Sequence, residues 1–243
     1  MGPPIELAPP KPDWEPVVSA RGSGAVGLAS QFLPEADAET VAELASVRSR
    51  DEPDALPEAW WYLVFLRWCA LDLEGAKVFA DGEAKRGRKD IQTAFFRAWG
   101  TVDWMAAMVA AEPAGRSSTL TRAVTESLTP AHFADALTLV QEPGRLPDGN
   151  LKERILRQIA GADADVALTH ALAIGDRASR ERAVDGVIQR LAESDVEAAV
   201  RLIDSLSSPD DRTAARFGLA RALAKSAEDP ATFAALFSDC LLY

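Results

Sequence analysis

The chain has 243 residues, and 48% of them are hydrophobic, which is typical of a globular protein rather than a disordered one. Its formal net charge of −11 at pH 7 argues against nucleic-acid and anionic-membrane partners, because both bind clustered cations. The longest apolar run, residues 59–66, is too short to span a bilayer and ends at Arg67. We therefore expect no nucleic-acid and no membrane partner.

The two cysteines, Cys69 and Cys240, lie far apart in the sequence and have neither metal-ligand spacing nor a disulfide framework. The first residues carry neither the basic segment nor the apolar run of a signal peptide. These features favour a reduced compartment, and we expect a cytoplasmic protein.

Residues 1–33 are rich in proline and glycine. Six of the 15 prolines fall within residues 1–16, and each proline fixes φ and removes a backbone donor, so an extended tail is expected there. Residues 9–14 could bind an aromatic groove on a partner. A disordered leader over residues 1–33 is the simpler interpretation.

The leader contains one sequence that imitates a cofactor motif. Residues Gly22 to Gly27 satisfy G-x-G-x-x-G, in which glycines allow a pyrophosphate to approach the backbone at the start of a helix. That motif requires a βαβ unit, whereas residues 37–48 and 58–71 both have helical periodicity. A flexible linker explains the same glycines, so no cofactor is expected. A nucleotide-binding protein that uses the Gly22–Gly27 loop is the alternative function.

From Asp37 onward the hydrophobic pattern is helical. Residues 59–68 are apolar on nearly every helical face, which predicts a helix that is buried on several sides. The helix that follows ends near Gly82, and four cations then fall within five residues. These cations are Lys85, Arg86, Arg88 and Lys89. They form either a docking patch for a partner or a solvated loop beyond the negative end of a helix.

The second half of the chain continues this design. Residues 91–99 and 103–111 form one predicted helix pair, and residues 120–127 and 131–140 form a looser copy. A cluster of helix breakers at residues 142–150 predicts a kink.

One kind of position recurs through the helical region. Residues suited to cap the second helix of each pair are spaced 31, 26, 34, 32 and 34 residues apart. They are Asp72, Asp103, Thr129, Asp163, Asp195 and Asp229. Such periods indicate helix–turn–helix units that bury their apolar faces only by stacking. The sequence therefore predicts an all-α protein, an α-solenoid of about six antiparallel helix pairs over residues 34–243.

The period of about 34 residues and the Asp-Pro-x-x-x-Ala sequence at 229–234 resemble tetratricopeptide-type repeats. The units are also similar to HEAT-like helix pairs. Both families usually hold a peptide or a partner surface on a concave face. The resemblance therefore implies a non-catalytic protein–protein interaction scaffold.

The side chains that most often carry chemistry fit structural roles in this sequence. Asp163 occupies a cap position and Asp165 the first helical turn, where a carboxylate favours the positive end of the helix dipole. His132 and His170 belong to no metal-spaced group and have no recognisable nucleophile nearby in the sequence. We expect neither a catalytic residue nor a metal site.

The tryptophans and the C-terminal end are the remaining candidates for partner contacts. Trp60 and Trp104 lie off the register of the core positions, so an exposed one would be the best anchor for a partner. Residues 237–243 lack the polar outer face of a terminal repeat. This end could therefore pair with another copy, or the chain could be a subunit of a larger helical assembly.

Overall fold

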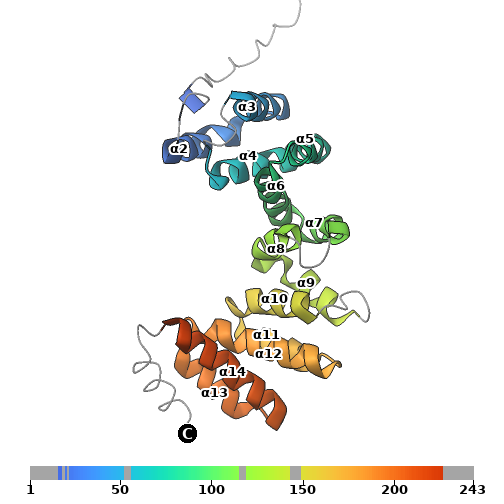
Figure 1. Ribbon diagram of the computed structural model, residues 1–243, viewed down its shortest axis with the longest axis vertical. Helices are drawn as coiled ribbons and strands as arrows, with labels where there is room; N and C mark the ends of the chain where they lie inside the picture. The colour runs from blue at the N-terminus through green and yellow to red at the C-terminus, as the bar shows by residue number, and fades with distance from the viewer. Residues whose placement is uncertain are drawn as a thin grey trace, which may run out of the picture. The chain divides into compact units, whose positions relative to one another are not determined.

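The computed structural model describes residues 16–17, 20, 22–51, 56–114, 119–142 and 149–226. Within these ranges the chain forms thirteen α-helices, three short 3-10 helices and no β-strand, so the all-α prediction is confirmed (Figure 1). None of these helices combines the length and the apolar character needed to cross a bilayer. The chain divides into two compact units, residues 1–102 and 103–243, where the sequence predicts one helical domain from residue 34. The predicted kink falls mainly on residues 143–148, outside the described ranges.

The first unit is organised around helix α4. Its described helices are α2 (Gly22–Phe32), η1 (Leu33–Glu35), α3 (Ala38–Asp51), α4 (Glu58–Leu71), α5 (Leu73–Lys85) and α6 (Lys89–Val102). Helix α4 contacts α2, α3, α5 and α6. The ring centres of Trp68 and Phe79 are 5.4 Å apart, and those of Phe65 and Phe95 are 5.5 Å apart. The helix predicted to be buried on several sides is therefore the core of this unit.

Helix α2 lies where the sequence predicts a flexible linker. Ala25 and Ala29 lie one helical turn apart and are fully buried, and α2 packs on α4. This small apolar stripe gives the segment a surface to bury, which favours a helix in spite of its three glycines. The leader predicted over residues 1–33 is thus helical from residue 22, and residues 1–15 lie outside the described part.

Four of the predicted aspartate caps are confirmed. In Asp72, Asp103, Asp163 and Asp195 a carboxylate oxygen accepts a hydrogen bond of 2.8–3.0 Å from the backbone N–H three residues later. Their φ angles lie between −153° and −144° and their ψ angles between 86° and 93°. Each carboxylate satisfies one N–H of a first turn that has no partner inside its helix. The same local geometry therefore starts four different helices.

The predicted cap at Thr129 is wrong. Thr129 precedes the 3-10 helix η3 (Pro130–His132), and its side chain makes no capping hydrogen bond. Its hydroxyl instead lies 3.2 Å from Nδ1 of His132, so the ring replaces the backbone as its partner. The last predicted cap, Asp229, lies outside the described residues.

The second unit contains a row of helices that lie side by side. Its helices are α7 (Trp104–Ala111), η2 (Glu112–Ala114), α8 (Thr119–Glu126), η3, α9 (Phe133–Gln141), α10 (Gly149–Ala160), α11 (Ala164–Leu172), α12 (Arg177–Ala192), α13 (Val196–Ser205) and α14 (Pro209–Ser226). Helix α12 lies between α10 and α14 and makes the unit's most extensive contacts with both (Figure 1). Helix α8 packs on α10, whereas α11 packs on α10 and α12, and α13 on α12 and α14. We call α8, α10, α12 and α14 the row helices and α9, α11 and α13 the intervening helices.

The row helices approach one another closely at two glycines. A Cβ atom at Gly218 on α14 would lie 2.3 Å from the backbone carbonyl oxygen of Asp185 on α12. A Cβ atom at Gly186 on α12 would lie 2.8 Å from Cγ of Glu153 on α10. Both glycines and both acids are 32 residues apart, so a glycine-to-acid contact recurs along the row, with the side chain of Glu153 in one case and the backbone of Asp185 in the other.

Replacement of Gly218 by alanine tests this packing. Alanine favours a helix over glycine by about 1 kcal/mol, but overpacking against a backbone carbonyl costs about 1–3 kcal/mol. We expect Gly218→Ala to lower the free energy of unfolding by up to about 2 kcal/mol in urea denaturation. Gly82→Ala on α5 is the matched control, because its Cβ would meet nothing within 4 Å. A gain of stability at both positions would contradict the close approach of α12 and α14.

Candidate functional site

Trp60 and Trp104 are both fully buried, so the predicted aromatic anchor for a partner is wrong. The indole N–H of Trp104 donates a hydrogen bond of 3.0 Å to the backbone oxygen of Val124. The ring centres of Trp60 and Trp61 are 4.8 Å apart, and the guanidinium of Arg48 lies 5.9 Å from the centre of the Trp60 ring. Both tryptophans lie in helices that are apolar on nearly every face, so their register could not identify an exposed side.

The four predicted docking cations divide into two pairs. Arg86 and Arg88 both form ion pairs with Glu83, whose side chain is completely buried. Arg88 also donates hydrogen bonds of 2.7 Å to the backbone oxygen and the hydroxyl of Ser49. Arg88 thus holds the turn between α5 and α6 against α3, whereas Lys85, Arg86 and Lys89 are exposed. Of the four cations, Arg88 is the one with a clear structural role.

The other residues with chemical character also have structural surroundings. Gly24 and Gly27 lie inside α2, whereas the dinucleotide fingerprint needs its glycines in a loop after a strand. His170 accepts a 2.9 Å hydrogen bond at its backbone oxygen from Gln141, which joins α9 to α11. Among the residues that the structure describes, no group of three or more His, Cys, Asp and Glu could hold a metal ion. The C-terminal residues 237–243 lie outside that part of the chain.

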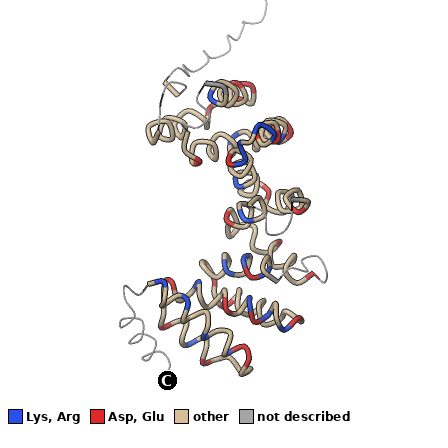
Figure 2. The backbone as a smooth tube through the Cα atoms, in the orientation of Figure 1, with Lys and Arg blue, Asp and Glu red and all other residues tan. Residues whose placement is uncertain are grey.

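Charge is distributed unevenly between the two kinds of helix in the second unit (Figure 2). The row helices contain twelve Lys and Arg and six Asp and Glu. The cations are Arg122, Lys152, Arg154, Arg157, Arg177, Arg180, Arg182, Arg190, Arg212, Arg216, Arg221 and Lys225. The intervening helices contain one cation, Arg201, and four acids. Excess positive charge is thus concentrated on the row helices of a chain whose net charge is −11.

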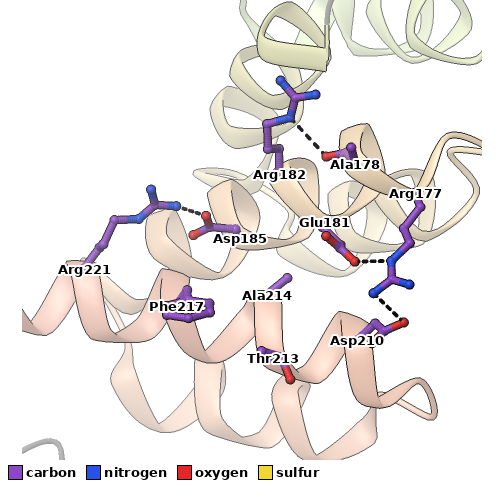
Figure 3. Close-up of a pocket in the computed structure, with 10 residues that line it drawn as sticks. All are labelled: Arg177, Ala178, Glu181, Arg182, Asp185, Asp210, Thr213, Ala214, Phe217 and Arg221. Carbon is purple, nitrogen blue, oxygen red and sulfur yellow. Dashed lines mark hydrogen bonds and ion pairs between the residues drawn. The ribbon is translucent and has the colours of Figure 1, made fainter.

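Two grooves open between the row helices. The larger, of about 690 Å³, lies between α12 and α14, and we call it the Phe217 groove (Figure 3). Its charged lining consists of Arg177, Glu181, Arg182, Asp185, Asp210 and Arg221. Phe217 is 64% exposed although it is a large aromatic side chain. An exposed aromatic ring in a groove with a charged border is typical of a surface that contacts another molecule.

Ion pairs hold the arginines of the Phe217 groove in place. Arg177 contacts Glu181 over 2.6 Å and Asp210 over 2.9 Å, so it links α12 to α14. Arg221 on α14 forms an ion pair with Asp185 on α12 (Figure 3). The side chain of Arg182 donates to the backbone oxygen of Ala178 and to Oδ1 of Asn150 on α10. These contacts reduce the side-chain freedom that a bound partner would otherwise have to restrict.

The smaller groove, of about 270 Å³, lies between α8, α10 and α12. We call it the arginine groove, because Arg122, Arg154, Arg157 and Arg190 line it. Thr125, Glu126, Gln158 and Glu193 complete the lining, so its side chains are all polar and carry two more positive than negative charges.

Glu193 gathers cations from three row helices. Its carboxylate accepts hydrogen bonds from Arg157 on α10 and Arg190 on α12, both at 3.2 Å, and from Lys225 on α14 at 3.1 Å. Burial raises the pKa of the Glu193 carboxyl, but the hydrogen bonds from Lys225 and Arg190 and the charge of Arg157 hold its pKa below the ordinary value of 4.5. The carboxylate therefore stays ionised and fixes the guanidinium groups at the edge of the arginine groove.

Neither groove is among the sites that the sequence predicts. Each forms only where specific helices pack side by side, and that pairing is not encoded in any local motif. One signal was nevertheless present, because the helices before Asp163 and Asp195 together carry seven Lys and Arg, whereas the helices after them carry one. A count of the charges made separately for alternate helices would have indicated which helices form the cationic row.

Comparison of the chain with protein-family models, with curated proteins and with solved structures finds no match in any of the three.

The role of Arg88 can be tested by replacement with alanine. Loss of Arg88 would remove one of two cations that balance a buried carboxylate, and breaking a buried ion pair costs about 3 kcal/mol. We expect Arg88→Ala to lower the free energy of unfolding by about that amount in urea denaturation. Lys85→Ala, which removes an exposed cation of the same segment, should change it by less than about 0.5 kcal/mol. Equal effects of the two variants would contradict the structural role of Arg88 and favour the docking patch that the sequence predicts.

The role of Glu193 can be tested through pH. Because its pKa is lower in the folded chain than in the unfolded chain, its stabilising effect is complete above the unfolded value of 4.5. That effect is lost as the pH falls through the folded value. We expect Glu193→Gln to cost about 1 kcal/mol of unfolding free energy at neutral pH and much less at about pH 3. A cost that is the same at both pH values would show that the charge of Glu193 does not hold the three cations.

Proposed function

We propose that this chain is a non-catalytic protein–protein interaction scaffold of helical-repeat type. In this proposal the row helices and the intervening helices are the two layers of an α-solenoid, and the exposed side of the row helices binds an acidic segment of a partner protein. The observation that carries the proposal is the excess of six positive charges on the row helices, beside an excess of three negative charges on the intervening helices.

The α-solenoid part of the proposal rests on two structural features that repeat along the chain. Four aspartate caps share one backbone geometry, and glycine-to-acid contacts recur after 32 residues along the row. In helical-repeat proteins each unit contacts mainly its neighbours, and one extended surface serves as the binding face. The side-by-side contacts of α10, α12 and α14 agree with this arrangement.

The charge on the exposed side of the row helices determines which kind of partner it can bind. Seven arginines line the two grooves, and five carboxylates lie among them. An acidic peptide complements the excess of cations, whereas the affinity of a nucleic acid would be lowered by the repulsion between its many phosphates and a chain whose net charge is −11. The guanidinium groups of arginine stay protonated in proteins and are poor general acids and bases, which favours binding over catalysis.

Selection of displayed peptides tests this function. Random twelve-residue peptides would be selected on the immobilised full chain, and we expect enrichment of sequences rich in Asp and Glu. Their affinity should fall by about fivefold or more in Arg190→Glu, because a charge that faces the peptide is reversed. The matched control is Arg201→Glu on α13, since both arginines are exposed and each pairs with a glutamate of its own segment. Absence of enriched acidic peptides, or equal binding by both variants, would contradict the proposal.

A further inference from the structure

The two grooves adjoin on one side of the row helices. Helix α12 borders both, with Arg182 and Asp185 in the Phe217 groove and Arg190 in the arginine groove. Between them lies Glu153 on α10. Its carboxylate interacts electrostatically with Arg154 and Arg157 of one groove and with Arg182 and Arg221 of the other. One bound segment can therefore reach both grooves without leaving this side of the unit.

The grooves offer different chemistry to a ligand. The Phe217 groove has apolar surface from Ala178, Ala214 and the exposed ring of Phe217. The side chains that line the arginine groove are all polar, and four of them are arginines. An apolar side chain gains free energy only in the first groove, where it removes apolar surface from water. A carboxylate gains more in the second, where the guanidinium groups offer charge-assisted hydrogen bonds.

The separation of the grooves follows from helix geometry. Phe217 lies level with Asp185 on α12, because its neighbour Gly218 contacts Asp185. Arg190 is five residues further along α12, which corresponds to a rise of about 7.5 Å. The midlines of the two grooves lie on either side of α12, one helix spacing or about 9 Å apart. Together with the rise along α12, this places the grooves about 12 Å apart, a distance that three or four residues of extended chain span.

We infer that the partner segment is an extended acidic peptide with two anchors. An apolar side chain occupies the Phe217 groove, and an Asp or Glu three or four residues away in the sequence occupies the arginine groove. This inference rests on the function proposed above and adds a spacing to it. The pairing of Arg221 with Asp185 and of Arg190 with Glu193 keeps both anchor points ordered before binding.

Fluorescence anisotropy with synthetic peptides tests the spacing. Each probe is a fluorescein-labelled twelve-residue peptide of Gly and Ser that carries one Leu and one Asp-Asp pair. In the matched probes the pair lies three and four residues from Leu, before it or after it, and in the compact probes it is adjacent to Leu. We expect at least one matched probe to bind the full chain about tenfold more tightly than the compact probes, because only it fills both grooves.

The contribution of Phe217 to binding of the apolar anchor can be tested in the same assay. Phe217→Ser should remove the advantage of the matched probe and leave the binding of a probe with Ser in place of Leu unchanged. Val78→Ser is the control, because Val78 is 72% exposed but lies on α5 in the other unit. Both side chains are exposed, so neither substitution should unfold the chain.

The outcomes separate this inference from the function on which it rests. Equal binding of matched and compact probes, or equal effects of Phe217→Ser and Val78→Ser, would overturn the two-anchor inference. If Arg190→Glu still weakened all acidic probes, the proposed function would stand without it. If Arg190→Glu weakened none, both would fail. A twelve-nucleotide oligothymidine that bound more tightly than every peptide would overturn both in favour of nucleic-acid binding.

Discussion

The packing of α12 between α10 and α14 is the interaction on which the rest of the second unit depends. Gly218 lets α14 lie against the backbone of α12, and Gly186 leaves room on α12 for the side chain of Glu153 from α10. Buried aliphatic side chains such as Val187, Ile188 and Leu219 then fill the space on the covered side of the row. Because these side chains fill the covered side, the arginines of the row helices extend toward solvent, and all of them are exposed or half-buried.

Arginines that only extended toward solvent would be a set of mobile cations that repel one another. Asp185 and Glu193, on α12 and directly after it, pair with arginines of α10, α12 and α14 and with Lys225 of α14. Each carboxylate lowers the repulsion between guanidinium groups and restricts their rotation, yet the face keeps an excess of positive charge. A face that is both ordered and cationic can bind an acidic segment at a lower entropic cost than a set of free side chains.

The sequence predicted features that depend on short stretches of chain. The caps at Asp72, Asp103, Asp163 and Asp195 depend on residues three apart, so local pattern was sufficient. The patterns failed where packing decided the outcome, as for Trp60, which is buried although it lies off the core register.

Long-range pairing also decided the position of the grooves. Phe217 became a candidate only when α14 was placed beside α12, and Arg122 joined the arginine groove only through the contact of α8 with α10. Within the first unit, Glu83 could not be recognised as a buried acid without the tertiary contacts of Arg88.

Hydrogen exchange of the full chain with and without an acidic peptide would locate the binding face, because it reports where a ligand is held without any substitution. We expect backbone amides of α10, α12 and α14 to exchange more slowly in the presence of the peptide, and those of α9, α11 and α13 to be unchanged. Protection that is concentrated on α11 and α13, or that is absent from the row helices, would contradict the assignment of the cationic side as the binding face.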